Sequence, residues 1–326
     1  MTDVLDYVAV MPKVELHCHL EGSVPAATAI RLAARNGVAL PTDDPDQLYR
    51  FGSLEQFLDL YVAVSAALAG PDDLAQAVYD SLADAARGSH LRYREFAFNP
   101  TNHPGVKLAD MLPAMADAAR SAESEFGVVT RFLVAINREQ PPEVALELVR
   151  SVVALEHPYV VGIGLDHNEL AGPPALFADA FALAGAAGLG RTAHAGERGN
   201  ATEVRETIEL LGVDRIDHGY AVLGEPQLVS ESIAAGVHFA SCWTTSSFHS
   251  AGRSPIPDMV AAGLPVSVSS DDPPMFGTDI GREHAAAAAG LAWSPADARA
   301  FVLRAAAAAF GPDDLAGRLE AEFDAL

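Results

Sequence analysis

The stretch Val14-Glu15-Leu16-His17-Cys18-His19 decides between the two folds that the sequence allows. Its apolar and β-branched positions predict a short strand over Val14–His19. An open, doubly wound sheet would need a glycine-rich phosphate loop, Gly-x-Gly-x-x-Gly, after an early strand. This strand ends instead in His-Cys-His. The sequence therefore favours a closed barrel over an open sheet.

Short apolar runs and alanine-rich segments with helical periodicity alternate along the whole chain. The expected strands are Val14–His19, Tyr93–Phe98, Thr130–Ile136, Val160–Leu165, Arg191–His194, Arg215–His218, Val237–Cys242 and Val266–Ser270. The helices expected between them include Ala26–Asn36, Leu108–Phe126, Glu143–Glu156, Ala175–Ala187, Thr202–Leu211 and Pro226–Ala235. Eight such units predict an α/β fold, a (β/α)8 TIM barrel.

The chain is longer than a minimal barrel, because it has 326 residues and such a barrel needs about 250. We expect the surplus in helices Leu54–Leu68 and Asp72–Arg87, inserted after the first strand, and in Arg282–Gly290 and Pro295–Phe310 near the C-terminus. The sequence contains no low-complexity linker and no internal repeat. We therefore expect residues 1–326 to form a single domain.

The charge balance limits the partners of the chain. Its 44 acidic and 21 basic residues give a net charge of −23. Such an acidic surface repels phosphate backbones and anionic membranes, so we expect neither a nucleic acid nor a membrane as a partner. The charge also favours an uncharged small-molecule substrate over a strongly anionic one. The sequence does not indicate an oligomeric state.

The sequence predicts a cytoplasmic protein. The segment Met1–Met11 contains Asp3 and Asp6 but no basic residue, unlike a signal peptide. No apolar run is long enough to span a bilayer. The two cysteines, Cys18 and Cys242, cannot form a disulfide framework.

Histidines and carboxylates follow the apolar runs at four of the expected strand ends. His17 and His19 are two positions apart, so both side chains point to the same face of the strand, while Cys18 faces the helices. In a barrel these strand ends meet at one mouth, where imidazole and carboxylate groups together suit zinc. The expected ligands are His17, His19, His194 and Asp271.

Two related metal chemistries are excluded by residues that the chain lacks. Many barrel hydrolases bridge two ions with a carbamylated lysine on the fourth strand, but the only lysines are Lys13 and Lys107. Cytidine-type deaminases use a Cys-x-x-Cys motif, which is absent. One zinc ion per chain is therefore expected.

Four motifs in this order resemble the adenosine deaminase family of the amidohydrolase superfamily. The resemblance runs over roughly Met11 to Ala309. The matching stretches are Pro12-Lys13-Val14-Glu15-Leu16-His17-Cys18-His19-Leu20-Glu21-Gly22-Ser23, His194-Ala195-Gly196-Glu197, Arg215-Ile216-Asp217-His218-Gly219-Tyr220 and Ser270-Asp271-Asp272-Pro273.

This resemblance implies a mononuclear zinc enzyme in which activated water attacks C6 of a 6-aminopurine and ammonia leaves. It implies that Glu197 protonates ring N1 and that His218, helped by Asp271, orients or deprotonates the water. Asp272 is similar to the residue that hydrogen-bonds N7. The substrate contacts that we expect on this basis are Asp272, His19, Glu21 and His167.

The motifs conflict over the group on N9 of the purine. Glu21 resembles the adenine deaminases, and His167 replaces a glycine of the nucleoside enzymes, whereas His218-Gly219-Tyr220 resembles the nucleoside enzymes. The stretch Asp271–Thr278 also resembles the aminofutalosine deaminases. Adenosine or a 5′-modified adenosine is the leading expectation, and free adenine or aminofutalosine is the alternative. A purine-binding barrel without activity, or a zinc hydrolase of lactones or amides, is an alternative of another class.

Several other residues have two interpretations. His249 and His167 could line the pocket. Phe57, Leu58 and Tyr61 could pack in the core or cover the purine as a lid. The remaining histidines considered are interpreted as surface or structural residues, namely His90, His103, His157 and His284.

Overall fold

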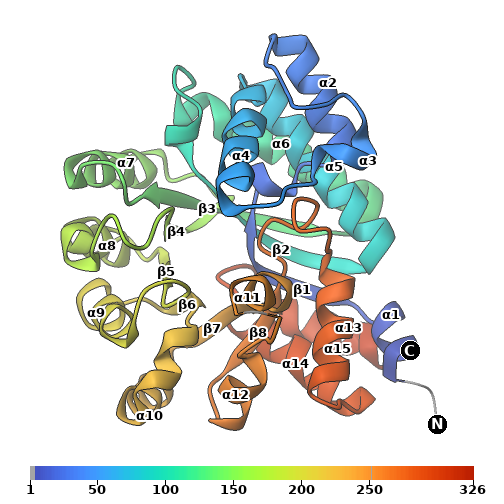
Figure 1. The fold of residues 1–326 in the computed structure, drawn as a ribbon, viewed down its shortest axis with the longest axis vertical. Helices are drawn as coiled ribbons and strands as arrows, with labels where there is room; N and C mark the ends of the chain where they lie inside the picture. Colours follow the sequence, from blue (N-terminus) through green and yellow to red (C-terminus); the bar gives the residue numbers. More distant parts are fainter. Residues whose placement is uncertain (1–3, 251) are drawn as a thin grey trace.

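The computed structural model describes residues 4–250 and 252–326, and in it eight parallel strands follow one another in sequence order around a nearly closed barrel (Figure 1). The strands are β1 (Lys13–His19), β2 (Leu91–Phe98), β3 (Val129–Asn137), β4 (Val160–Asp166), β5 (Gly190–Ala195), β6 (Arg215–His218), β7 (His238–Cys242) and β8 (Val266–Ser269). The predicted (β/α)8 barrel is confirmed, with each predicted strand displaced by no more than a few residues.

The barrel closes where β1 meets the residues that follow β8. The backbone N–H of His19 donates to the carbonyl oxygen of Asp271 at 2.9 Å, and the N–H of Asp271 donates to the carbonyl oxygen of His17 at 3.2 Å. Cys18 and Asp271 form an isolated parallel bridge at this seam. The first and last strands of the barrel therefore meet at residues that were predicted to bind metal.

Helices surround the strands, and in Figure 1 α2 to α6 lie together along one side of the molecule. The helices are α1 (Val4–Val10), α2 (Ala26–Asn36), α3 (Pro45–Leu48), α4 (Leu54–Ala67), α5 (Pro71–Ser89), α6 (Leu108–Phe126), α7 (Pro142–Leu155), α8 (Ala178–Ala186), α9 (Ala201–Leu211), α10 (Pro226–Ala235), α11 (Trp243–His249), α12 (Ile256–Ala261), α13 (Ile280–Gly290), α14 (Pro295–Ala307) and α15 (Leu315–Phe323). Helices α4 and α5 correspond to the predicted insertion helices Leu54–Leu68 and Asp72–Arg87, and α13 and α14 are the predicted C-terminal additions, whereas α3 and α15 were not predicted.

Local sequence signals account for several helix ends. Gly37 ends α2 in the left-handed conformation, at φ 68°, which a glycine adopts without steric cost. Ser294 and Asp297 form a capping box at the start of α14, where each side chain bonds the other residue's backbone N–H. Helix α1 was not among the predicted elements. Among the described residues no helix is both long and apolar enough to cross a membrane.

The buried apolar residues form two clusters. One surrounds β4 to β8 and includes Ile163, Ile216 and Phe239. The other joins β1 and β2 to the inserted helices, and in it Cys18 packs in the same cluster as Val64. This placement agrees with the prediction that Cys18 faces the helices. Because fully burying one such apolar side chain contributes about 1.5–3 kcal/mol, the inserted helices are firmly attached to the barrel.

Candidate active site

The predicted site residues meet at the carboxyl ends of the strands. A cavity of about 800 Å³ opens there, a volume typical of sites that enclose a small organic ligand. Its lining includes His19, His194, Glu197, His218 and Asp271. The cavity therefore lies at the end of the barrel where (β/α)8 enzymes carry their chemistry.

Four side chains converge on one point in the floor of this cavity. His17 Nε2 lies 3.0 Å from Asp271 Oδ1, and His19 Nε2 lies 3.4 Å from the same oxygen. His19 Nε2 and His194 Nε2 are 3.2 Å apart. Ligands bound at about 2.0–2.1 Å around a tetrahedral zinc ion are separated by roughly 3.3 Å. The spacing of the four predicted ligands is therefore that of donors around one ion.

The orientation of His194 supports a cation at this point. Its Nδ1 lies 3.1 Å from the carbonyl oxygen of Leu165, which can only accept a hydrogen bond. Nδ1 therefore carries the proton and Nε2 presents a lone pair toward His19. Nε2 of His19 and Nε2 of His194 lie 3.2 Å apart, and the Asp271 carboxylate faces the same point. These three groups can act together as metal donors.

Asp217, for which the sequence suggested no role, lies behind two of these histidines and is nearer to His17. Its Oδ1 lies 3.3 Å from His17 Nδ1, and its Oδ2 lies 3.9 Å from His194 Nδ1. Burial would raise the pKa of Asp217, but the adjacent His17 holds it well below its usual value. Asp217 is therefore an anion that directs Nε2 of His17 toward Asp271, as a carboxylate behind a metal-bound histidine does.

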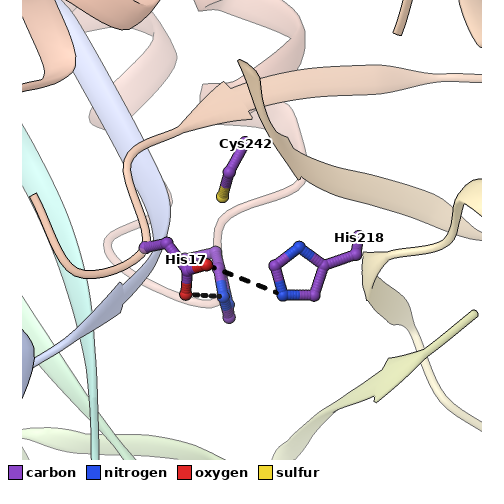
Figure 2. Close-up of side chains that lie close together, drawn as sticks. His17, His218 and Cys242 are labelled. Carbon is purple, nitrogen blue, oxygen red and sulfur yellow. Dashed lines mark hydrogen bonds and ion pairs between the residues drawn. The ribbon is translucent and has the colours of Figure 1, made fainter. Parts of the chain in front are cut away.

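A second set of possible donors shares two of these residues. Figure 2 shows His17, His218 and Cys242 pointing toward one another, and together with Asp271 their donor atoms lie within 4.8 Å of each other. Burial raises the pKa of the Cys242 thiol well above its usual value, and the charge of Asp271 raises it further. A neutral thiol is a weak metal ligand, so the set of three histidines and Asp271 fits an ion better.

Two carboxyl groups beside the donor cluster have pKa values raised well above the usual range. Burial raises the pKa of Glu197 well above its usual value, and the negative charges of Asp271 and Glu169 raise it further. Burial and Asp271 have the same effect on the pKa of Asp272. Glu197 Oε1 and Asp272 Oδ1 are buried without a hydrogen-bond partner among the described residues. Both groups can therefore serve a ligand that enters the cavity.

The hydrogen bonds of His218 leave one of its nitrogens free to accept a proton. Tyr220 donates its hydroxyl proton to the carbonyl oxygen of Cys242 at 3.1 Å, so its oxygen accepts from His218 Nδ1 at 3.3 Å. His218 Nε2 faces Asp271 Oδ2 at 3.9 Å. Burial lowers the pKa of His218 to about 4. The ring is therefore neutral near pH 7, with the lone pair of Nε2 directed toward the donor cluster.

Three strand ends at the site have unusual backbone conformations. His167, His218 and Asp271 have φ values of 69°, 68° and 64°, in the left-handed region that residues other than glycine seldom adopt. They follow or end β4, β6 and β8. Strain of this kind is concentrated at functional sites, where it aims side chains that a regular strand would point elsewhere.

Gly22 leaves room for one of the carboxyl groups. A Cβ atom on Gly22 would overlap the carboxylate of Asp272. Glycine is therefore required there by close approach, since the Gly22 backbone closes one side of the Asp272 side chain.

The predicted substrate contacts lie differently with respect to the cavity. Asp272, His19 and His167 line it, whereas Glu21 is fully buried and is not among the lining residues. Glu21 Oε1 lies 3.2 Å from Nε2 of His103, which does line the cavity. Burial would raise the pKa of Glu21, but this hydrogen bond holds it below its usual value. Glu21 therefore acts on the cavity through His103.

The other histidines considered in the sequence divide into those that line the cavity and those that lie away from it. His249 lines the cavity, with Nε2 at 3.5 Å from Glu197 Oε1, and His167 bonds Asp166 Oδ1 at 2.7 Å. His103, interpreted as surface or structural, is buried in the cavity wall. The other three lie away from the cavity: His90 and His157 are partly exposed and His284 is buried.

The inserted helix α4 forms the apolar side of the cavity. Phe57, Leu58 and Tyr61 all line it, as the lid interpretation predicted. Phe57 also packs in the core, with its ring centroid 5.0 Å from that of Phe276 and 5.3 Å from that of Phe51. Phe57 therefore packs in the core and also lines the cavity, whereas Leu58 is 50% exposed and belongs to the lining alone.

The comparisons with known proteins agree with this geometry. The family model described as adenosine deaminase matches residues 12–326. The chain belongs to the adenosine deaminase family. The predicted resemblance is confirmed, and the protein is an enzyme of the adenosine and adenine deaminase type.

Individual members of the adenosine deaminase family bear on the substrate. An aminodeoxyfutalosine deaminase from Acidothermus cellulolyticus is 37% identical over 297 residues, which cover 86% of this chain and 83% of the relative. An adenine deaminase from Chlorobium luteolum is 34% identical over 319 residues, which cover 95% of this chain and 92% of the relative. A crystal structure of an amidohydrolase from Burkholderia ambifaria with bound zinc has a TM-score of 0.90 and 32% identity, covering 100% of this chain and 94% of that one. The leading expectation of adenosine is not supported by these relatives, whereas the alternatives of free adenine and aminofutalosine are.

Proposed function

We propose that the protein is a zinc-dependent hydrolase that converts a 6-aminopurine to the 6-oxopurine and ammonia. One observation carries this proposal: a cluster of four metal donors shares a cavity with Glu197 and Asp272, whose carboxyl groups are both buried with raised pKa values. A barrel that only binds a purine would need neither the donors nor an acid beside them. The bound zinc of the Burkholderia ambifaria structure supports zinc as the ion.

The residues of this chain would divide the chemistry as follows. His17, His19, His194 and Asp271 would hold the ion, which lowers the pKa of a coordinated water to about 7 when bound. His218 Nε2 would accept the proton of the attacking water, because the ring is neutral near pH 7. Glu197, whose pKa is raised by burial and by the nearby charges of Asp271 and Glu169, would donate a proton to N1 and so make C6 electrophilic.

Asp272 would recognise the other edge of the purine. With its raised pKa, its carboxyl group can donate a hydrogen bond to N7. Two carboxyl groups with raised pKa values beside one cavity suit a ring that presents nitrogen acceptors, whereas a lactone or simple amide presents no such pair. Residues 1–326 would act as one catalytic domain, because the proposed residues come from strands throughout the same barrel.

For the substrate, we propose first an adenine with a large N9 substituent, of the aminodeoxyfutalosine type, and second free adenine. The cavity of about 800 Å³ is large for a bare purine, and Leu58 and Val62 keep 50% and 66% of their surface exposed beside it. These apolar side chains would cover a substituent that extends past the ring. Free adenine is favoured by Glu21 and by the Chlorobium luteolum relative.

A deamination assay by ultraviolet absorbance tests the proposal. Purified protein with its zinc content measured would be supplied with aminodeoxyfutalosine, adenine and adenosine, and Glu197→Gln would serve as the inactive control. We expect about one zinc per chain and a kcat/KM at least tenfold higher for aminodeoxyfutalosine than for adenosine. Full activity without metal would overturn the mechanism, and absence of turnover on every 6-aminopurine would overturn the function.

A further inference from the structure

Glu169, which follows β4, holds the loop that carries Glu197. Its carboxylate accepts hydrogen bonds from three consecutive backbone N–H groups, those of Glu197 at 3.1 Å, Arg198 at 3.0 Å and Gly199 at 2.7 Å. Glu169 is only 6% exposed. Hydrogen bonds to an ionised carboxylate are about twice as strong as neutral ones, so this single side chain fixes the backbone on which Glu197 stands.

The sequence of the loop is adapted to this contact. A Cβ atom on Gly199 would overlap the side chain of Glu203 and lie 3.1 Å from Glu169 Oε2. Gly196, at φ 73°, turns the chain directly after β5 in the left-handed region. Glycines on both sides of Glu197 therefore let the backbone wrap closely around the Glu169 carboxylate.

Arg138, directly after β3, supports Glu169 through its backbone carbonyl. The Arg138 side chain is fully buried and donates to the carbonyl oxygen of Glu169 at 3.3 Å and to Glu203 Oε1 at 2.7 Å. It also donates to the carbonyl oxygen of His194. One guanidinium thus links the end of β3, the loop after β4, the end of β5 and the start of α9, and His194 and Glu197 are held in one rigid frame.

We propose that Glu169 is a positioning residue for deamination, which sets the height and angle of the Glu197 carboxyl group against the purine ring. This inference rests on the proposed function. Glu169 lines the same cavity, and its charge also contributes to the raised pKa of Glu197. Removing the Glu169 carboxylate should therefore change both the position of the Glu197 carboxyl group and its pKa.

The variants Glu169→Gln and Glu169→Asp separate these two effects. Glutamine keeps the size of the side chain, but its NH2 group cannot accept a backbone hydrogen bond and the charge is lost. We expect kcat to fall roughly 10- to 100-fold, with KM changed less than about threefold and zinc content unchanged. The alkaline limb of the kcat profile should move to lower pH. Aspartate keeps the charge but is one methylene shorter. We therefore expect kcat to fall, because the loop shifts, while the alkaline limb of the kcat–pH profile stays in place.

Hydrogen exchange provides a readout that does not depend on activity. The amides of residues 197–199 should exchange faster in Glu169→Gln than in the wild type. Glu209→Gln is the matched control, because Glu209 is an exposed residue of α9 whose ion pair with Arg205, at 3.6 Å, lies on the surface. Unchanged exchange and unchanged kcat in Glu169→Gln would overturn the inference, as would loss of zinc together with activity. If exchange rises but the wild type deaminates no purine, the proposed function fails and the bracing role stands.

Discussion

The carboxylate of Asp217 lies 3.3 Å from Nδ1 of His17 and 3.9 Å from Nδ1 of His194, behind two of the four proposed metal ligands. Asp217 therefore faces the His17 ring from the side opposite to Asp271, while the His194 ring is oriented by its bond to the carbonyl oxygen of Leu165. Asp217→Asn should keep the fold but weaken the hold on His17, and we expect zinc affinity to fall about 10- to 100-fold. Competition with a chromophoric chelator measures this change.

The matched control for Asp217 is Asp214→Asn. Asp214 precedes β6 and pairs with the partly exposed Arg191 at 3.3 Å, at the opposite end of the strand. Its zinc affinity should equal that of the wild type. An Asp217→Asn protein that binds zinc as tightly as this control would contradict the orienting role.

Loss of the acid at position 197 should separate catalysis from metal binding. Glu197→Gln cannot protonate a ring nitrogen, and we expect kcat to fall by about 10²–10⁴-fold while zinc content stays near one per chain. Ammonia release and elemental analysis on the same preparation measure both quantities. Retention of more than about a tenth of the wild-type kcat would show that another group supplies the proton.

A methyl group at position 22 should displace Asp272. Because the added Cβ would overlap the Asp272 carboxylate, we expect Gly22→Ala to lose roughly 10- to 100-fold in kcat/KM with zinc retained. Gly224→Ala is the control, since nothing lies within 4 Å of a Cβ at that position. Equal activity of the two variants would mean that Asp272 does not recognise the purine.

Leu58 tests whether the apolar side of the cavity covers an N9 substituent. Leu58→Ser removes about 1 kcal/mol of apolar contact, so KM for aminodeoxyfutalosine should rise roughly fivefold while KM for adenine is unchanged. Leu210→Ser removes a comparably exposed leucine, 46% against 50%, on α9 and outside the cavity lining. A uniform rise in KM for both substrates would argue against a subsite at Leu58.

Two buried histidines away from the metal site should make the fold sensitive to acid. Burial lowers the pKa of both His238 and His284 from 6.5 to about 3. Between these values the unfolded chain binds more protons than the folded one, so stability is full above about pH 6.5 and is lost as the pH falls. From pH 7 to pH 5 each histidine should reduce the free energy of unfolding by about 2 kcal/mol.

Urea unfolding at the two pH values measures this loss. His238→Gln keeps an amide group that can bond Ser267 Oγ, which His238 Nε2 contacts at 2.8 Å, and it does not titrate. Its stability should fall less between pH 7 and pH 5 than that of the wild type. If the free energy of unfolding falls equally between pH 7 and pH 5 in His238→Gln, His284→Gln and the wild type, other groups cause the acid sensitivity.

Much of the barrel was predictable because each strand has its own apolar pattern and its own following helix. The convergence of the proposed metal donors was predictable for the same reason, since His17 and His19 lie two positions apart on a strand whose direction fixes where they point. Asp217, Glu169 and Arg138 were not predicted. Asp217 adjoins His218 in the sequence. The roles of Asp217, Glu169 and Arg138 depend on contacts with residues that only the closed barrel brings near them.

Glu21 shows what the sequence leaves open. Its place after His19 suggested a direct substrate contact, which stays a prediction, and in the 3-10 turn Glu21–Ser23 its Oε1 lies 3.2 Å from Nε2 of His103. Glu21 and His103 are both visible in the sequence, but they are 82 positions apart, so their hydrogen bond could not be predicted. The positive φ values of His167, His218 and Asp271 were also beyond prediction, because nothing in their side chains requires them.

The seam between β1 and β8 also bears on how the protein acquires its ion. His17 and Asp271 are 254 positions apart in the chain, and they become neighbours only when the last strand docks against the first. A nascent chain that has not yet made residue 271 can offer three histidines but no complete coordination sphere. Tight metal binding would therefore need residue 271 to be made and placed, and a bound ion would fasten the joint between the first and last strands.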